Sequence, residues 1–192
     1  MINEILPKKK EKSISLVLGS GGARGLAHIG VIHWLEVNGF KIESISGCSI
    51  GALIGGIHAA GKLDEYERWV RAITRTDIVK LLDLSWGKSG LVKGDKIINT
   101  LTELVGDVVI EDLPIAFTAV ATDILHGKEV WINSGNLFEA MQGTIARQKL
   151  AAYPAEHLIE IARNACGTLE FDRASEMIEL GYNRAQKCLG RS

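Results

Sequence analysis

Residues 14–25 read ISLVLGSGGARG and residues 43–51 read ESISGCSIG, two glycine-rich stretches that set the architecture of this chain. Each begins with the apolar pattern of a strand and ends in small residues that allow a tight turn. A helical pattern follows both turns. Two strand–turn–helix units in succession predict an α/β fold in which neighbouring strands run parallel in one sheet.

The helices after the two turns are predicted from spacing and composition. Apolar residues recur at helical spacing over residues 26–38, and Gly39 ends this pattern. The next helix, residues 50–60, is rich in Gly and Ala, so it can lie very close to the sheet at some loss of helix propensity. Its N-terminus points at Ser49.

The rest of the chain continues the alternation of strands and helices. The patterns predict a loop at 86–90, paired strands at 115–121 and 129–132, and helices over 62–73, 95–104, 137–145 and 172–189. We expect a mostly parallel sheet covered by helices on both faces. We also expect the apolar stripe of the last helix to pack on this sheet rather than on a membrane.

Length and composition indicate a single globular domain. Of the 192 residues, 46% are hydrophobic and 23% are charged, and the net charge of −1 argues against a partner that is a nucleic acid. The one basic run, from Lys8 to Lys12, is interrupted by Glu11. We therefore expect residues 1–12 to form a solvated, flexible arm and residues 13–192 to form the domain.

Cysteine usage and the lack of long apolar runs indicate a cytoplasmic protein. Cys48, Cys166 and Cys188 have no C-x-x-C spacing, which fits free thiols in a reducing compartment. We find no signal-peptide pattern and no apolar run of membrane-spanning length, so we expect any membrane contact to be peripheral. No residues have metal-ligand spacing, and we expect neither a metal nor a cofactor.

The second turn, Gly47-Cys48-Ser49-Ile50-Gly51, matches the G-x-S-x-G pattern of a nucleophile elbow. In such an elbow a serine lies on a sharp bend between strand and helix, with small neighbours that leave its Oγ exposed. The glycine-rich first turn supplies the complementary part, because its backbone N–H groups can hold a developing oxyanion. The two turns together predict a site for acyl transfer.

The first turn, residues 19–25, also has competing interpretations. A dinucleotide-binding loop requires a glycine where Arg24 stands, and an acidic residue at the end of the second strand, where Cys48 and Ser49 stand instead. A P-loop requires Lys and then Ser or Thr after its last glycine, whereas Leu and Ala follow Gly25. The remaining alternative is a tight turn that carries no chemistry.

These motifs resemble the patatin-like phospholipases, in particular their short bacterial cytosolic branch. Residues 19–25 are similar to that family's G-x-G-G-x-[RK]-G oxyanion loop, and residues 47–51 are similar to its elbow. The stretches 90–94, 121–130 and 167–174 also follow the family's pattern, so the resemblance spans most of the chain. It implies a three-layer α/β/α fold, hydrolysis of acyl esters in lipids, and a Ser–Asp dyad without a catalytic histidine.

The resemblance implies roles for individual residues. Ser49 would be the nucleophile, in an elbow that includes Gly47 and Gly51. The oxyanion hole would be built from the first turn, by Gly21, Gly22, Ala23 and Arg24. Its backbone amides would stabilise the tetrahedral intermediate, where loss of one donor typically costs about 10²–10³ in rate. Arg24 would brace the loop or contribute its charge.

The sequence departs from the family pattern at the catalytic base. The family's aspartate lies in an Asp-Gly motif downstream of a segment similar to residues 143–146, but this sequence contains no Asp-Gly pair. We expect a break near residues 146–147, where the base-bearing segment is either lost or lies outside this sequence. Asp123 after a strand is an alternative base, and a Ser-Asp-His order with His126 or His157 is another.

Two functions remain open after these observations. The first is a lipid acyl hydrolase, a patatin-like phospholipase or esterase, that acts through Ser49 on a lipid or another acyl ester. The second is a catalytically impaired relative that binds acyl chains or lipids without turnover. The missing Asp-Gly motif separates them, because a serine hydroxyl without an adjacent base is a weak nucleophile at neutral pH.

Overall fold

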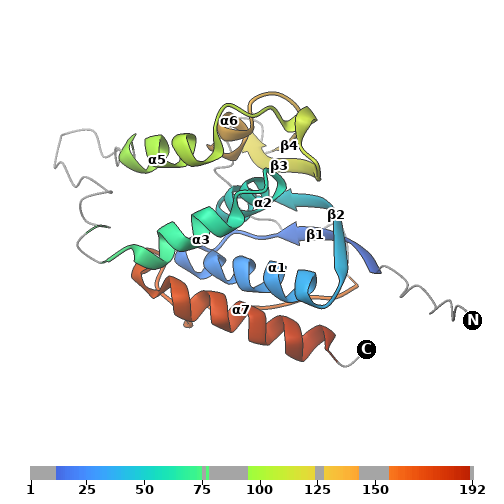
Figure 1. Ribbon diagram of the computed structural model, residues 1–192, viewed down its shortest axis with the longest axis vertical. Helices are drawn as coiled ribbons and strands as arrows, with labels where there is room; N and C mark the ends of the chain where they lie inside the picture. The colour runs from blue at the N-terminus through green and yellow to red at the C-terminus, as the bar shows by residue number, and fades with distance from the viewer. Residues whose placement is uncertain (1–11, 75–76, 78–94, 124–127, 143–155, 191–192) are drawn as a thin grey trace, which may run out of the picture.

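The computed structural model describes residues 12–74, 77, 95–123, 128–142 and 156–190 (Figure 1). The elements in chain order are β1 (Lys12–Leu18), η1 (Gly22–Leu26), α1 (Ala27–Val37), β2 (Phe40–Gly47), α2 (Ile50–Ala59), α3 (Leu63–Ala72), α5 (Asp95–Val105), η2 (Ile110–Asp112), β3 (Ala116–Asp123), β4 (Lys128–Ile132), α6 (Leu137–Gln142), η3 (Phe171–Arg173) and α7 (Ala174–Leu189). Residues 1–11 of the arm predicted at 1–12, and the predicted loop at 86–90, lie outside the described residues. Lys12 belongs to β1 rather than to the arm.

The four strands form one sheet in the order β1-β2-β3-β4. The pairs β1–β2 and β2–β3 are parallel, and β3–β4 is antiparallel. The parallel pairs are joined by chain segments that contain helices, as parallel strands require, while a short connection suffices for the antiparallel pair. The predicted α/β class with a mostly parallel sheet is therefore confirmed.

Helix α2 packs against the sheet so closely that its glycines are required. A Cβ on Gly55 would lie 2.7 Å from Cγ2 of Ile45, and a Cβ on Gly51 would lie 2.7 Å from the carbonyl oxygen of Gly19. Real Cβ atoms essentially never come this near to other atoms. The composition of residues 50–60 thus reflects close packing on the sheet, as predicted, and the helix is almost entirely buried.

The C-terminal helix α7 packs alongside α1 (Figure 1), and not on the sheet as we expected from its apolar stripe. Two glycines explain this preference. A Cβ on Gly30 of α1 would lie 2.6 Å from the backbone nitrogen of Tyr182, and a Cβ on Gly181 of α7 would overlap the carbonyl of Ala27. Because neither position carries a side chain, the two helix backbones meet and bury the stripe between them.

The two faces of the sheet differ in exposure. Leu18, at the end of β1, is only 2% exposed and belongs to the hydrophobic core, whereas its neighbour Val17 is 77% exposed. The strand register places Trp131 of β4, which is 54% exposed, on the same face as Val17. The core therefore lies on the α2 side of the sheet. Over the described part of the chain, no helix combines the length and apolar character needed to cross a membrane.

Candidate active site

Ser49 occupies a strained bend between β2 and α2. Its backbone has φ 53° and ψ −127°, and it is the only non-glycine residue with positive φ among those that the structure describes. L-residues adopt this region only where the surrounding structure enforces it, and such strain concentrates at functional sites. Two hydrogen bonds enforce it here, from the Cys48 amide to the Leu18 carbonyl (3.1 Å) and from the Leu53 amide to the Ser49 carbonyl (3.0 Å).

Both glycines of the elbow are required by sterics. A Cβ on Gly47 would lie 2.6 Å from the backbone nitrogen of Ala52, and a Cβ on Gly51 would lie 2.6 Å from the carbonyl carbon of Leu18. The end of β2 and the first turn of α2 are thus pressed against each other and against β1. This packing is the physical reason for the G-x-S-x-G spacing around Ser49.

The first glycine turn leads into η1, which begins at Gly22 with φ +56°. A Cβ on Gly22 would lie 2.6 Å from both the Cγ2 and the carbonyl oxygen of Thr168, so this position also requires glycine. The next amide, that of Ala23, donates a hydrogen bond to the Thr168 carbonyl at 2.9 Å. The Ala23 N–H is therefore engaged by the C-terminal part of the chain, although the sequence suggested it as an oxyanion donor.

The two glycine turns meet at Gly25 and Ile50. A Cβ on Gly25 would overlap Cγ2 of Ile50, which is the first residue of α2 and follows Ser49 directly. Because Gly25 lies in η1, this contact places the turn at residues 19–25 beside the elbow. The structure therefore brings together the two motifs that the sequence singled out separately.

Arg24 braces the first turn against a distant segment. Its Nη1 donates hydrogen bonds to the carbonyl oxygens of Arg163 (2.7 Å) and Cys166 (3.2 Å). These partners lie 139 and 142 residues further along the chain. Of the two roles considered for Arg24, bracing and a contribution of charge, these hydrogen bonds favour bracing.

His28, on the first turn of α1, also holds the glycine turn. Its Nε2 lies 2.9 Å from the carbonyl oxygen of Gly19, and because a carbonyl only accepts, Nε2 must carry the proton. Burial lowers the pKa of His28, an effect that the hydrogen bond to Gly19 partly opposes. Burial of His28 therefore favours the neutral form of its imidazole, and its Nε2 is used in the hydrogen bond to the glycine turn.

The alternative bases proposed from the sequence are placed only in part. Asp123 ends β3, beyond the point where Ala119 pairs with Gly47, so its backbone lies toward the same sheet edge as the elbow. His157 is exposed. His126 and the expected break near residues 146–147 lie outside the described residues, as does the side chain of Asp123.

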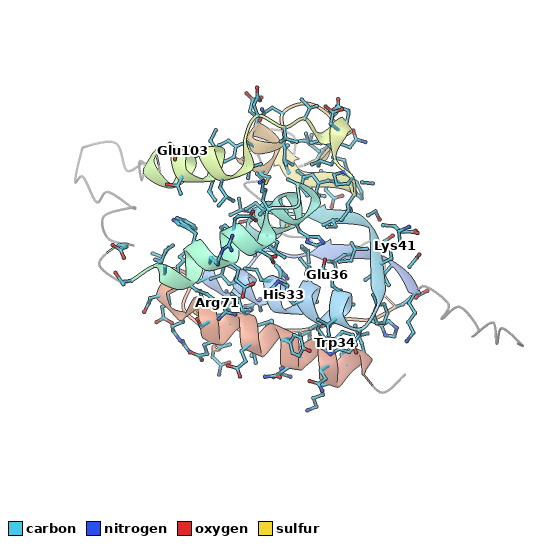
Figure 2. All side chains as sticks on the ribbon, in the orientation of Figure 1. His33, Trp34, Glu36, Lys41, Arg71 and Glu103 are labelled. Atoms are coloured by element: carbon cyan, nitrogen blue, oxygen red, sulfur yellow. The ribbon has the colours of Figure 1, made fainter. Side chains whose placement is uncertain are left out.

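A cluster between α1 and α3 was not predicted from the sequence. The ligand atoms of His33, Asp64 and Glu67 lie within 4.8 Å of one another, with His33 Nε2 3.3 Å from Glu67 Oε2. Figure 2 labels His33 of α1 and Arg71 of α3. Arg71 Nε donates to the other carboxylate oxygen of Glu67 at 2.7 Å. We interpret this cluster as a network of polar side chains that includes the Arg71–Glu67 ion pair. Sequence spacing could not reveal it because its members come from two helices.

In this mostly parallel sheet, β2 leads through a strained serine into a buried helix beside a glycine turn. This is the arrangement of α/β proteins with a nucleophile elbow. The chain belongs to the patatin-like phospholipase family, whose model matches residues 16–181. This match confirms the resemblance that the motifs indicated.

Relatives of known sequence are similar over most of this chain. An uncharacterized NTE family protein of Mycobacterium bovis is 50% identical over 133 residues, which cover 69% of this chain and 37% of the relative. The neuropathy target esterase of Drosophila persimilis is 33% identical over 139 residues, 70% of this chain and 10% of that protein. The chain thus spans little more than a third of the mycobacterial relative and a tenth of the insect one.

Among solved structures, VipD from Legionella pneumophila is similar to part of the chain. The match covers 50% of this chain and 17% of VipD, with 30% sequence identity and a TM-score of 0.39.

Proposed function

We propose that the chain is a lipid acyl hydrolase, a patatin-like phospholipase or esterase, in which Ser49 is the nucleophile. The observation that carries the proposal is the strained backbone of Ser49, at φ 53° and ψ −127°, between β2 and α2. Membership of the patatin-like phospholipase family supports an ester of a fatty acid as substrate. We propose a lipid or another acyl ester, reached by peripheral contact with a membrane surface.

In the proposed reaction Ser49 Oγ attacks the acyl carbonyl carbon, and the carbonyl oxygen becomes an oxyanion. The Ala23 amide is bonded to Thr168, so we assign the oxyanion to the amides of Gly21 and Gly22. Gly21 directly precedes η1 and Gly22 is its first residue. N–H groups at the start of a helix have no partner within the helix. Collapse of the tetrahedral intermediate breaks the ester C–O bond, and the alcohol leaves with the proton that Ser49 has given up. Water then hydrolyses the acyl-enzyme to release the fatty acid and restore Ser49.

The first turn of α2 supports the same step electrostatically. Helix α2 begins at Ile50, so its N-terminal amides and the positive end of its dipole lie next to Ser49. A fixed positive field of this kind stabilises the developing negative charge without reorganisation, which is usually the largest contribution to such catalysis. The closely packed glycines at 47 and 51 hold this helix end in place.

Proton transfer from Ser49 requires a base, and the sequence contains no Asp-Gly pair of the family type. Asp123 is the candidate within this chain, since β3 runs parallel to β2 and ends beyond the pair Gly47–Ala119. The absence of the Asp-Gly pair favours a second candidate function, which is binding of acyl chains or lipids without turnover.

Labelling with a fluorophosphonate probe tests the proposal. We expect the chain to take up one label per molecule, Ser49→Ala to take up none, and Ser46→Ala, a matched serine in β2, to label like the parent. Hydrolysis of short- and long-chain p-nitrophenyl esters then separates the two functions. Labelling with turnover supports the hydrolase, and binding of a fluorescent fatty acid without turnover supports the second function. A folded parent that takes up no label contradicts the role of Ser49.

A further inference from the structure

The oxyanion loop rests on a segment near the C-terminus. The Ala23 amide donates to the Thr168 carbonyl at 2.9 Å, and Arg24 Nη1 donates to the carbonyl oxygen of Cys166 at 3.2 Å. Gly22 lies so close to Thr168 that no side chain fits between them. The positions of Gly22, Ala23 and Arg24 are thus fixed by contacts with residues 166–168.

Residues 166–168 belong to no helix or strand. A neighbouring residue can hold their conformation through hydrogen bonds. Glu170 does so: its Oε2 accepts the Gly167 amide at 2.9 Å, and its own amide donates back to the Gly167 carbonyl at 3.3 Å. Arg173 Nη1 donates to the same Oε2 at 2.9 Å. These hydrogen bonds close a turn over residues 167–170, with Thr168 inside it.

We propose that Glu170 is a positioning residue for the oxyanion loop, because its carboxylate closes the turn whose Thr168 carbonyl holds the Ala23 amide. The Glu170 carboxylate holds the Gly167 amide, and the Thr168 carbonyl in the same turn holds the Ala23 amide. The amides of Gly21 and Gly22 directly precede Ala23. The effect on catalysis rests on the proposed function, whereas the effect on the structure of the loop does not.

The electrostatics of the turn agree with this assignment. The hydrogen bond from the Gly167 amide, followed by that from Arg173, lowers the pKa of the Glu170 carboxyl below its usual value. Glu170 is therefore ionised near neutral pH, and a carboxylate accepts stronger hydrogen bonds than a neutral group. The turn is thus held by the Glu170 carboxylate, which the Gly167 amide and Arg173 orient.

Glu170 affects the proposed reaction by fixing the position of the amides that donate to the oxyanion, and such donors are sensitive to their position. Such donors must lie about 2.7–3.1 Å from the oxyanion, and misplacement by about 1 Å weakens catalysis strongly. Gly22, at φ +56°, has no side chain with which to hold its own conformation. Its position is therefore set from outside, by Thr168.

Glu176 provides a matched control, because it binds the other side of the same arginine. Arg173 donates from Nε to Glu176 Oε2 at 2.8 Å and from Nη2 to Oε1 at 2.5 Å. Both carboxylates are partly exposed and share Arg173, but only Glu170 binds the Gly167 amide. Both Glu170→Ala and Glu176→Ala remove an ion pair with Arg173, but only Glu170→Ala removes the acceptor of the Gly167 amide. Comparing the two variants therefore distinguishes the effect of closing the turn from the effect of losing an ion pair.

Hydrogen exchange tests the structural half of the proposal without any activity. We expect the Ala23 amide to exchange about tenfold faster in Glu170→Ala than in the parent, since the opening of its hydrogen bond becomes easier. Glu176→Ala should leave it unchanged, and Glu170→Gln, which keeps an acceptor, should restore most of the protection. Equal exchange of Ala23 in the two alanine variants overturns the proposal.

Kinetics test the catalytic half. We expect Glu170→Ala to lower the fluorophosphonate labelling rate and kcat by about tenfold, less than the full loss of one oxyanion donor, with little change in KM. Glu176→Ala should stay within twofold of the parent, or about 0.4 kcal/mol. An unlabelled parent contradicts the proposed function alone, because exchange at Ala23 still decides the role of Glu170. A labelled parent with unchanged rates in Glu170→Ala contradicts the positioning role.

Discussion

The backbone of Gly25 lies directly against the side chain of Ile50, with no room for a Cβ between them. Gly25 belongs to the 3₁₀ helix that follows the first glycine turn, and Ile50 begins the helix that follows Ser49. The contact therefore couples the two halves of the candidate site. Anything that separates Gly25 from Ile50 moves the first glycine turn, residues 19–25, away from Ser49.

We expect Gly25→Ala to lower the free energy of unfolding by about 1–3 kcal/mol, because the added methyl group overpacks this contact. Ile50→Ala removes the side chain that would clash. The double variant should therefore lose less stability than the sum of the two single variants. Urea unfolding of all four proteins measures this coupling, and strict additivity would show that the two residues do not interact.

We expect Ser49→Gly to be more stable than Ser49→Ala by about 1–2 kcal/mol. Both variants lack the hydroxyl group, but only glycine adopts φ 53° without strain. The comparison removes the contribution of the hydroxyl group, because both variants lack it. Thermal and urea unfolding give the difference, and equal stability would mean that the elbow stores no strain at Ser49.

We expect the free energy of unfolding to decrease as the pH falls below about 6.5. Burial lowers the pKa of His28 in the folded protein from 6.5, so the unfolded chain binds a proton first. The stabilisation is complete above pH 6.5 and is lost as the pH falls through the lowered pKa of the folded state. Burial lowers the pKa of His58 as well, which adds to the same trend.

The variant His28→Gln separates these two histidines. Glutamine can donate to the Gly19 carbonyl but does not titrate, so we expect a weaker pH dependence of urea unfolding between pH 7.5 and 5.5 than in the parent. His157→Gln, at an exposed position, serves as the control. An identical pH dependence in His28→Gln and the parent would contradict a neutral, buried His28.

We expect neighbouring residues of β1 to respond in opposite ways to substitution. Leu18→Ala should lower the free energy of unfolding by about 2–5 kcal/mol, because Leu18 is buried in the core against α2. Val17→Thr should change it by less than about 0.5 kcal/mol, since Val17 is 77% exposed. A large loss from Val17→Thr would indicate that this face is covered in solution.

Local patterns sufficed to predict the elements around the site. Strand, turn and helix follow each other within about a dozen residues at both glycine turns, so hydrophobic period and glycine placement identify them. The helix at 50–60 was recognised from its small residues, which the packing on Ile45 and Leu18 explains. The partner of α7 was predicted wrongly, because an apolar stripe shows that a face is buried but not what buries it.

The contacts that hold the first glycine turn, residues 19–25, could not be predicted from local patterns. Arg24 and Ala23 bind carbonyl groups some 140 residues away, and any residue offers such a carbonyl. The network of His33, Asp64 and Glu67 joins two helices in the same way. Side-chain identity marks a donor or acceptor, but its partner depends on how the chain folds back.

The sequence by itself determined that Ser49 stands between a strand and a helix, flanked by glycines. These features depend on the sterics of a few adjacent residues. Only the tertiary structure decided that the Ala23 amide is hydrogen-bonded to the Thr168 carbonyl, that Arg24 donates to the carbonyls of Arg163 and Cys166, and that the Glu170 carboxylate accepts the Gly167 amide. The physical reason is that hydrogen bonds between distant segments exist only once packing has brought their backbones together.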